Sequence, residues 1–207
     1  GRYSYFFESV QGGEKWGRFS VIGLPCRELI RVRGTRVSVE RDGKVIHQED
    51  CQQPFDFVER FREKIRVAPV PGLPGFAGGL VGYFAYDSVR YVETRIGPAL
   101  GEEVIDTPDI LLMVSDELLV FDNLRGTISF IINANPELED AYQSAQRRLQ
   151  ELQQKLAAPV ALPPRSAGRP GDQSALRFHF PEEDFKQAVE RIKEYIVAGD
   201  VMQVVLA

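Results

Sequence analysis

ELIRVRGTRVSVERDGKVIH, residues 28–47, is the stretch of sequence that decides the fold. Apolar and polar side chains alternate in three short runs within it, at 28–33, 35–40 and 44–47. Alternation with a period of two is typical of a β-strand that buries one face and exposes the other. Gly34 and the Arg-Asp-Gly turn at 41–43 separate the runs. The stretch therefore predicts an antiparallel meander with one face in water.

Further strands are expected on both sides of this meander. Two apolar patches, at 5–10 and 19–22, flank a polar, Gly-rich turn and read as a strand, a turn and a strand. An aromatic strand is expected within 76–87, and a continuous apolar strand at 110–114. The run at 118–121 is expected to pair with 127–132 across a short turn.

Three helices are predicted from apolar side chains at spacings of three and four. The first begins at Pro54, where a missing N–H does no harm. Its apolar face holds Phe57 or Val58, Phe61 and Ile65. The second begins with Asn135 as its N-cap and Pro136 in its first turn. Its stripe consists of Leu138, Tyr142, Ala145, Leu149, Leu152 and Leu156.

The third helix begins at Pro181 and ends at Gly199. Its apolar face holds Phe185, Ala188, Val189, Ile192 and Ile196. An apolar run at 201–207 then reads as a strand that has only begun. Such a strand needs partners or a cover, so we expect the chain to be part of a larger polypeptide.

The predicted fold class is α+β, with antiparallel β-sheets packed with helices. Strands predominate before residue 133, and antiparallel links join them. Between 157 and 173 the composition shifts to Pro, Gly, Ala and Arg, which is typical of a linker. The organisation expected is a domain at 1–157, a linker at 158–174 and the beginning of a second domain at 175–207.

Composition excludes several function classes. The 207 residues include 25 basic and 30 acidic side chains, a net charge of -5, with no basic block. Nucleic acid and anionic membrane are therefore not expected as partners. No run approaches the length of a membrane span, and no signal-peptide pattern opens the chain. Two separate thiols, Cys26 and Cys51, suit a reducing cytoplasm.

Few residues suggest chemistry when the sequence is considered alone. The glycines at 75, 78, 79 and 82 precede an aromatic strand rather than a helix, which favours a bent strand over a phosphate loop. Glu8 and Ser9 end an aromatic strand and offer a carboxylate and a hydroxyl. They could bind an ammonium and a carboxylate, as an amino acid presents, or cap the strand end. Asp87 and Arg90 fit a surface ion pair, and His47 and His179 fit structural histidines.

Several motifs, taken in order, resemble one enzyme family. They are FFES at 6–9, GRFSVIG at 17–23, GGLVGY at 78–83, YD at 86–87, RYVE at 90–93 and AGDVMQVVL at 198–206. Together they are similar to the N-terminal half of anthranilate synthase component I, up to the start of its chorismate-binding half. The resemblance implies the N-terminal part of that fold, truncated at the start of the chorismate-binding domain.

The resemblance also implies a function. The whole enzymes of this family convert chorismate and ammonia to anthranilate and pyruvate with Mg²⁺, and a glutamine amidotransferase partner subunit supplies the ammonia. Glu8 and Ser9 match the motif that lines the pocket for the feedback inhibitor L-tryptophan, with Phe6 and Phe7 in place of the usual leucines. Gln203 matches a position that borders the chorismate site. The catalytic residues and metal ligands are expected beyond this chain, so the fragment alone is expected to be inactive.

Two alternatives remain open. Aminodeoxychorismate synthase component I has the same fold and a similar N-terminal motif, and forms 4-amino-4-deoxychorismate. A non-catalytic domain that senses an amino acid is the other. The identity of the product separates the two enzymes, and tryptophan binding by the fragment tests the sensor.

Overall fold

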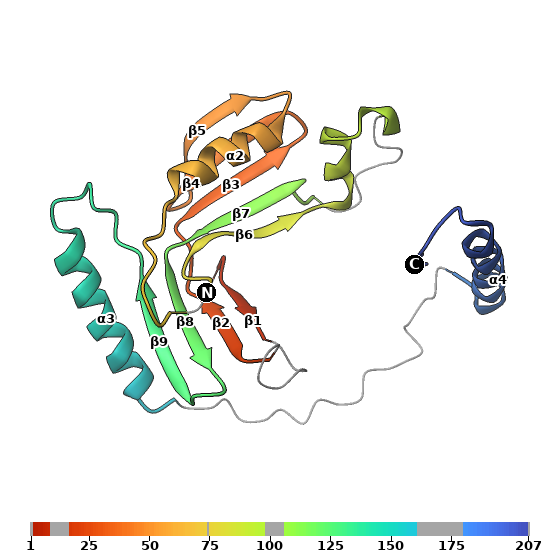
Figure 1. The fold of residues 1–207 in the computed structure, drawn as a ribbon. Helices are drawn as coiled ribbons and strands as arrows, with labels where there is room; N and C mark the ends of the chain where they lie inside the picture. The colour runs from red at the N-terminus through yellow and green to blue at the C-terminus, as the bar shows by residue number, and fades with distance from the viewer. Residues whose placement is uncertain (1, 9–16, 74, 98–105, 161–179, 207) are drawn as a thin grey trace. The chain divides into compact units, whose positions relative to one another are not determined.

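The computed structural model describes residues 2–8, 17–73, 75–97, 106–160 and 180–206. The chain divides into two compact units, Gly1–Pro159 and Val160–Ala207. Within the described ranges, the first unit holds two antiparallel sheets with helices, and the second holds one helix (Figure 1). The α+β class and the antiparallel sheets expected from the sequence are confirmed.

The four-stranded sheet has the order β1-β2-β8-β9. Its strands are β1 (Tyr5–Phe7), β2 (Phe19–Gly23), β8 (Glu117–Asp122) and β9 (Thr127–Ile132). Every neighbouring pair in this sheet is antiparallel. β1 is an edge strand of three residues, and Phe7 faces Val21 across the pair. The expected pairings of the first two strands and of 118–121 with 127–132 are both confirmed.

The five-stranded sheet has the order β5-β4-β3-β7-β6, also antiparallel. Its strands are β3 (Glu28–Arg33), β4 (Arg36–Arg41), β5 (Lys44–Asp50), β6 (Gly79–Phe84) and β7 (Ile110–Ser115). The meander predicted from residues 28–47 is β3-β4-β5. β6 forms the other edge of the sheet.

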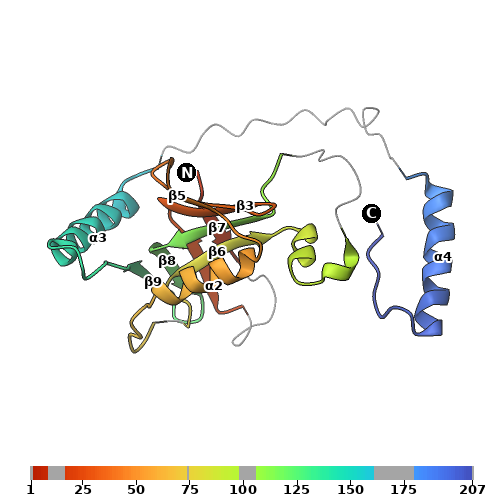
Figure 2. The same cartoon turned by 90° about the horizontal axis from the view of Figure 1, so that it is seen from above.

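The main core lies between this sheet and α2 (Pro54–Lys64), which lies across its face in both views (Figures 1 and 2). It consists of Ile30, Val32, Val37, Val39, Phe57, Val58, Ile110 and Leu112. The alternating positions of β3 and β4 are the ones that enter this core, because successive side chains of a strand point to opposite faces. Phe57 and Val58 both reach it, and Phe61 packs against it.

The two sheets share continuous stretches of chain. β7 leads into β8 through Asp116 alone, and β2 leads into β3 through residues 24–27. The backbone N–H of Leu24, in the β2–β3 connection, donates to the carbonyl of Glu117, at the start of β8, at 2.9 Å. This hydrogen bond joins the two connections. One edge strand of each sheet, β1 and β6, contributes to the hollow described below.

The helix expected from Asn135 begins later than predicted. Asn135 Oδ1 accepts a hydrogen bond from the N–H of Glu137 at 3.0 Å, and Ala141 N–H donates to the carbonyl of Leu138. These turns replace the first helical turn, so α3 is Ala141–Ala157 and lies beside β9 (Figure 1). Leu152 is its buried residue. Exposed members of the predicted stripe are Leu138, Tyr142 and Leu156.

Two short 3₁₀ helices, Tyr86–Tyr91 and Thr94–Ile96, follow β6. The predicted ion pair lies in the first of them rather than at a strand end. Arg90 Nε donates to Asp87 Oδ1 at 2.8 Å, within one turn of that helix.

The second unit contains α4 (Glu182–Ala198), whose predicted ends are confirmed. Gly199 adopts a left-handed conformation, with φ at 82°, and its N–H donates to the carbonyl of Ile196. The strand expected at 201–207 is wrong for 201–206, where no strand forms. A strand needs a hydrogen-bonded neighbour, and none of the described residues pairs with this run. Met202 is 98% exposed.

None of the helices in the described ranges is long and apolar enough to cross a membrane.

Candidate functional site

An apolar hollow of about 370 Å³ lies in the first unit, where strands of both sheets contribute its walls. Its lining residues are Phe7, Val21, Phe76, Leu80, Val81 and Gly82. Phe7 and Val21 come from the four-stranded sheet, and the last three come from β6. Apolar walls of this size fit the ring or side chain of a small organic ligand.

The first wall is set by the register of β1. Tyr5 faces Gly23 and Phe7 faces Val21, so all four lie on one face of the β1–β2 pair. A Cβ on Gly23 would collide with the Tyr5 ring, which therefore lies directly over this glycine. The centroids of the Tyr5 and Phe7 rings are 5.0 Å apart. Two contacting rings thus line one face of β1, and the second of them reaches the hollow.

The opposite wall depends on glycines in and before β6. A Cβ on Gly82 would collide with the backbone of Leu111 on β7, so only glycine allows the two strands to lie this close. Gly78 has φ at +137°, and a Cβ there would meet the side chain of Asn133. The close approach to a neighbour that these glycines predict is confirmed, whereas the bend stays a prediction.

Asn133 fixes the segment that carries Phe76. Its Nδ2 donates to the carbonyl of Ala77 at 2.7 Å, and its backbone N–H donates to the carbonyl of Asp116, also at 2.7 Å. Phe76 and Ala77 pack against a small core of Leu118, Val120 and Ile131. The segment that contributes Phe76 to the hollow therefore packs against the four-stranded sheet.

The predicted site residues fall in different places. Glu8 is exposed and directly follows Phe7, so it lies at the end of the strand that lines the hollow. Ser9 lies outside the described residues. Gln203 is exposed and belongs to the second unit. The structure thus brings Glu8 next to a wall of the hollow, and it leaves the roles of all three residues as predictions.

The histidines and cysteines were also considered as candidate functional residues. His47 is exposed on β5, with its Nε2 3.1 Å from Glu49 Oε2 and its ring stacked on Phe57. His179 lies outside the described residues. Both cysteines are free thiols. Burial and the nearby carboxylates of Asp116 and Glu117 raise the pKa of the Cys26 thiol to about 11.

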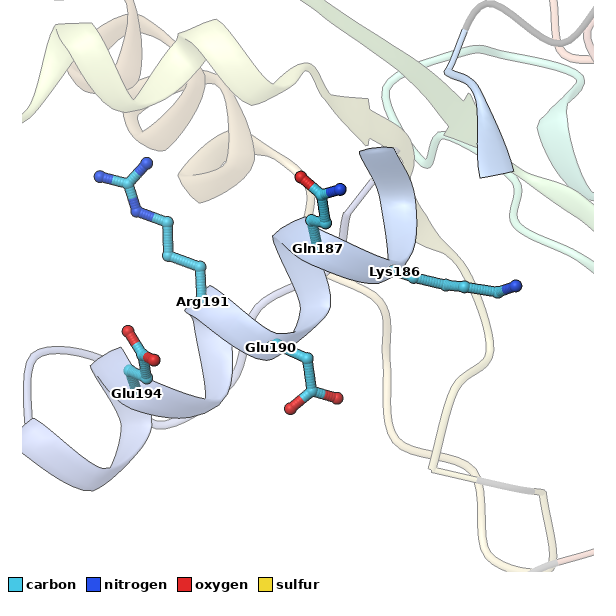
Figure 3. Close-up of a pocket in the computed structure, with 5 residues that line it drawn as sticks. All are labelled: Lys186, Gln187, Glu190, Arg191 and Glu194. Atoms are coloured by element: carbon cyan, nitrogen blue, oxygen red, sulfur yellow. The ribbon is translucent and has the colours of Figure 1, made fainter. Parts of the chain in front are cut away.

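A second hollow, of about 580 Å³, has a different character (Figure 3). It is lined by Lys186, Gln187, Glu190, Arg191 and Glu194, all on α4. In Figure 3 these side chains spread outward from a single helix. One helix provides no opposite wall, so we do not assign this surface as a binding site.

Metal ligands do not gather in the part of the chain that the structure describes. There, no three or more side chains among His, Cys, Asp and Glu lie close enough to hold a metal ion. The described residues therefore do not fit a Mg²⁺ site.

Sequence reasoning missed most of the hollow. It identified the end of β1, but not Phe76, Leu80 or Val81, which come from a segment about seventy residues later. The signal available was the glycine pattern around β6, which indicated a close approach without showing what approaches.

Comparison with known proteins identifies the family. The family model of chorismate binding enzymes matches residues 12–207 of this chain. The chain belongs to this family. The expected resemblance to anthranilate synthase component I is also confirmed, because family members with that name match over nearly the whole chain.

Two curated members of the family illustrate the similarity. Anthranilate synthase component 1 of Pseudomonas aeruginosa is 51% identical over 98% of this chain and 42% of its own length. The protein of the same name from Neisseria gonorrhoeae is 43% identical over 98% of this chain and 41% of its own length. The chain therefore spans about two fifths of the length of these relatives.

A solved structure supports the fold. The crystal structure of anthranilate synthase component I from Streptococcus pneumoniae matches 97% of this chain and 42% of that chain, with a TM-score of 0.59. The sequence identity is 23%, so this comparison supports the architecture alone.

Proposed function

We propose that this chain is the N-terminal part of an anthranilate synthase component 1. The domain at 1–157 is regulatory, 158–174 is a linker, and 175–207 begins the chorismate-binding catalytic domain. The complete protein is a lyase that converts chorismate and ammonia to anthranilate and pyruvate in tryptophan biosynthesis. The family match and the 51% identity to a relative of that name support this proposal.

The regulatory part of the proposal depends on one observation, the apolar hollow at the end of β1. L-tryptophan has an indole ring that suits apolar walls and an ammonium group that suits a carboxylate. We assign the ring to the hollow, the ammonium to Glu8 and a further hydrogen bond to Ser9. An inhibitor of this kind acts by binding one conformation of the enzyme more tightly than another.

Other components of the proposal belong to the complete enzyme. Mg²⁺ and the catalytic residues are assigned to the part of the enzyme that follows residue 207, and ammonia to a glutamine amidotransferase subunit. Gln203 is assigned to the border of the chorismate site. Its amide cannot act as a general base to activate water, which fits amination of chorismate better than hydration. The free thiols of Cys26 and Cys51 support a cytoplasmic location.

The test uses the full-length protein that contains this chain. Chorismate, Mg²⁺ and ammonium are supplied, and anthranilate fluorescence is followed with and without L-tryptophan. We expect anthranilate to form and tryptophan to suppress it. A product that the appropriate lyase converts to 4-aminobenzoate would contradict the proposal and identify an aminodeoxychorismate synthase.

The isolated 207-residue chain provides the second arm of this test. We expect it to form no anthranilate. Saturable binding of tryptophan without any turnover in the full-length protein would instead favour a non-catalytic sensor.

A further inference from the structure

A hydrogen bond between Tyr5 and Ser115 joins the two sheets beside the hollow. Tyr5 Oη and Ser115 Oγ lie 2.7 Å apart, and either hydroxyl can donate. Tyr5 is on β1 of the four-stranded sheet, whereas Ser115 is the last residue of β7 in the five-stranded sheet. Ser115 is only 2% exposed. The bond is therefore a shielded contact between residues 110 positions apart, where it is worth more than on the surface.

β1 is a short edge strand. It is three residues long, and among the described strands it pairs with β2 alone. Before it, Tyr3 Oη accepts a hydrogen bond from Arg31 Nη2 of β3 at 2.5 Å. Tyr3 and Tyr5 thus attach the start of this segment to the five-stranded sheet. Phe7, at the other end, is 54% exposed.

The Tyr5 ring is in contact with the Phe7 ring. The Tyr5 ring covers Gly23, and the centroid of the Phe7 ring is 5.0 Å away. Burial raises the pKa of the Tyr5 hydroxyl further above its ordinary value. Loss of the bond to Ser115 removes the contact that ties the Tyr5 hydroxyl to the five-stranded sheet, and so weakens the support of the Phe7 ring that packs against Tyr5.

We propose that Tyr5, through its hydrogen bond to Ser115, is a positioning residue that sets the affinity of the hollow for its amino-acid effector. This inference rests on the proposed function, because it takes the hollow as the tryptophan site. Tyr5 does not line the hollow itself. It acts by holding Phe7 in the wall and Glu8, one residue later, at its end.

The test compares Tyr5→Phe and Ser115→Ala in the full-length enzyme. Each variant removes one hydroxyl and keeps the rest of the local structure. We expect the tryptophan concentration for half-inhibition to rise roughly five- to tenfold, with kcat and KM for chorismate within about twofold of the unsubstituted enzyme. Because both variants break one bond, the double variant should be no worse than either single variant.

Tyr91→Phe is the matched control. Tyr91 Oη donates to the carbonyl of Gly34 and lies 2.8 Å from Asp109 Oδ2, so this change also removes a partly buried hydroxyl from the first unit. Tyr91 packs against the main core and does not line the hollow. We expect Tyr91→Phe to lower the melting temperature without changing inhibition.

Three results would overturn the inference. The first is an unchanged inhibition curve in Tyr5→Phe and Ser115→Ala. The second is an equal shift of the inhibition curve in Tyr91→Phe. The third is a fall in kcat, or a rise in KM for chorismate, as large as the shift in inhibition. Either of these two results would indicate a general structural effect. If Tyr5→Phe fails to fold, Ser115→Ala alone decides the question. Absence of tryptophan inhibition in the unsubstituted enzyme would instead overturn the proposed function, and the inference with it.

Discussion

Arg18 and Asp122 form a two-point ion pair across the four-stranded sheet. Arg18 Nε donates to Asp122 Oδ1 at 3.0 Å, and Arg18 Nη2 donates to Oδ2 at 2.7 Å. The same carboxylate accepts the backbone N–H groups of Leu124 and Arg125 at the turn after β8. Arg18 immediately precedes β2, so this carboxylate connects the beginning of one strand to the end of its neighbour.

Asp122→Asn should destabilise the protein in a pH-dependent way. The hydrogen bonds from Arg18 and the turn hold the pKa of Asp122 at about 2, below the unfolded value of roughly 3.9. Because the folded pKa is the lower one, the stabilisation is fully present above the unfolded pKa and is lost as the pH falls through about 2. Urea unfolding measures the free energy of unfolding of the variant and of the unsubstituted protein. The difference between them should become smaller as the pH is lowered from 7.

Asp42→Asn provides the control for this pair. Asp42 also binds an arginine, Arg27, and its pKa is also lowered, but both side chains are largely exposed. Exposed pairs contribute little, so the variant should unfold close to the unsubstituted protein at pH 7. Two results would contradict this account: an equal loss of stability in the two variants, or a loss of stability in Asp122→Asn that stays the same toward pH 2.

Gly82→Ala should destabilise the first unit. The added Cβ would collide with the backbone of Leu111, which cannot move without disturbing the β6–β7 pair. Overpacking of this kind costs about 1–3 kcal/mol. Gly75→Ala is the control, because nothing lies within 4 Å of the corresponding Cβ. Chemical unfolding of both variants measures the difference, and similar stabilities would show that β6 can shift to admit a methyl group.

Cys26 should resist alkylation in the folded protein, whereas Cys51 should react. Cys26 is buried, and with a thiol pKa of about 11 only about one molecule in a thousand carries the reactive thiolate at pH 8. Cys51 is only partly buried. Mass spectrometry after brief treatment with iodoacetamide should locate the label on Cys51. In urea both cysteines should react, and rapid labelling of Cys26 without urea would contradict its burial.

The strands could be predicted because their signal is local. Alternation in 28–47 depends only on neighbouring residues, and the structure forms β3, β4 and β5 there. The start of α3 could not be predicted in this way. Asn135 and Pro136 satisfy the rules for a helix start, yet the Asn135 side chain closes a separate turn instead. Side chains of this type can form either structure, and only the surrounding fold decides between them.

The hollow could be predicted only in part, because it depends on contacts that are distant in sequence. The end of β1 was recognisable from its motif, but the wall that faces it comes from β6 and residue 76. Ser115 gives no signal in the sequence, since its role depends on Tyr5 lying over Gly23 on another sheet. The strand prediction for 201–206 is wrong for the opposite reason. The local pattern is that of a strand, but the run has no neighbour among the described residues.

Phe7→Ala should weaken inhibition by tryptophan more than Phe6→Ala. Both rings are about half exposed on β1, but successive residues of a strand point to opposite faces, and only Phe7 lines the hollow. Removing an aromatic wall should raise the half-inhibitory concentration roughly tenfold, because about 1–2 kcal/mol of apolar contact with the indole ring is lost. Phe6→Ala removes the same group from the other face and should leave inhibition within about twofold. Equal effects of the two substitutions would place the tryptophan ring elsewhere.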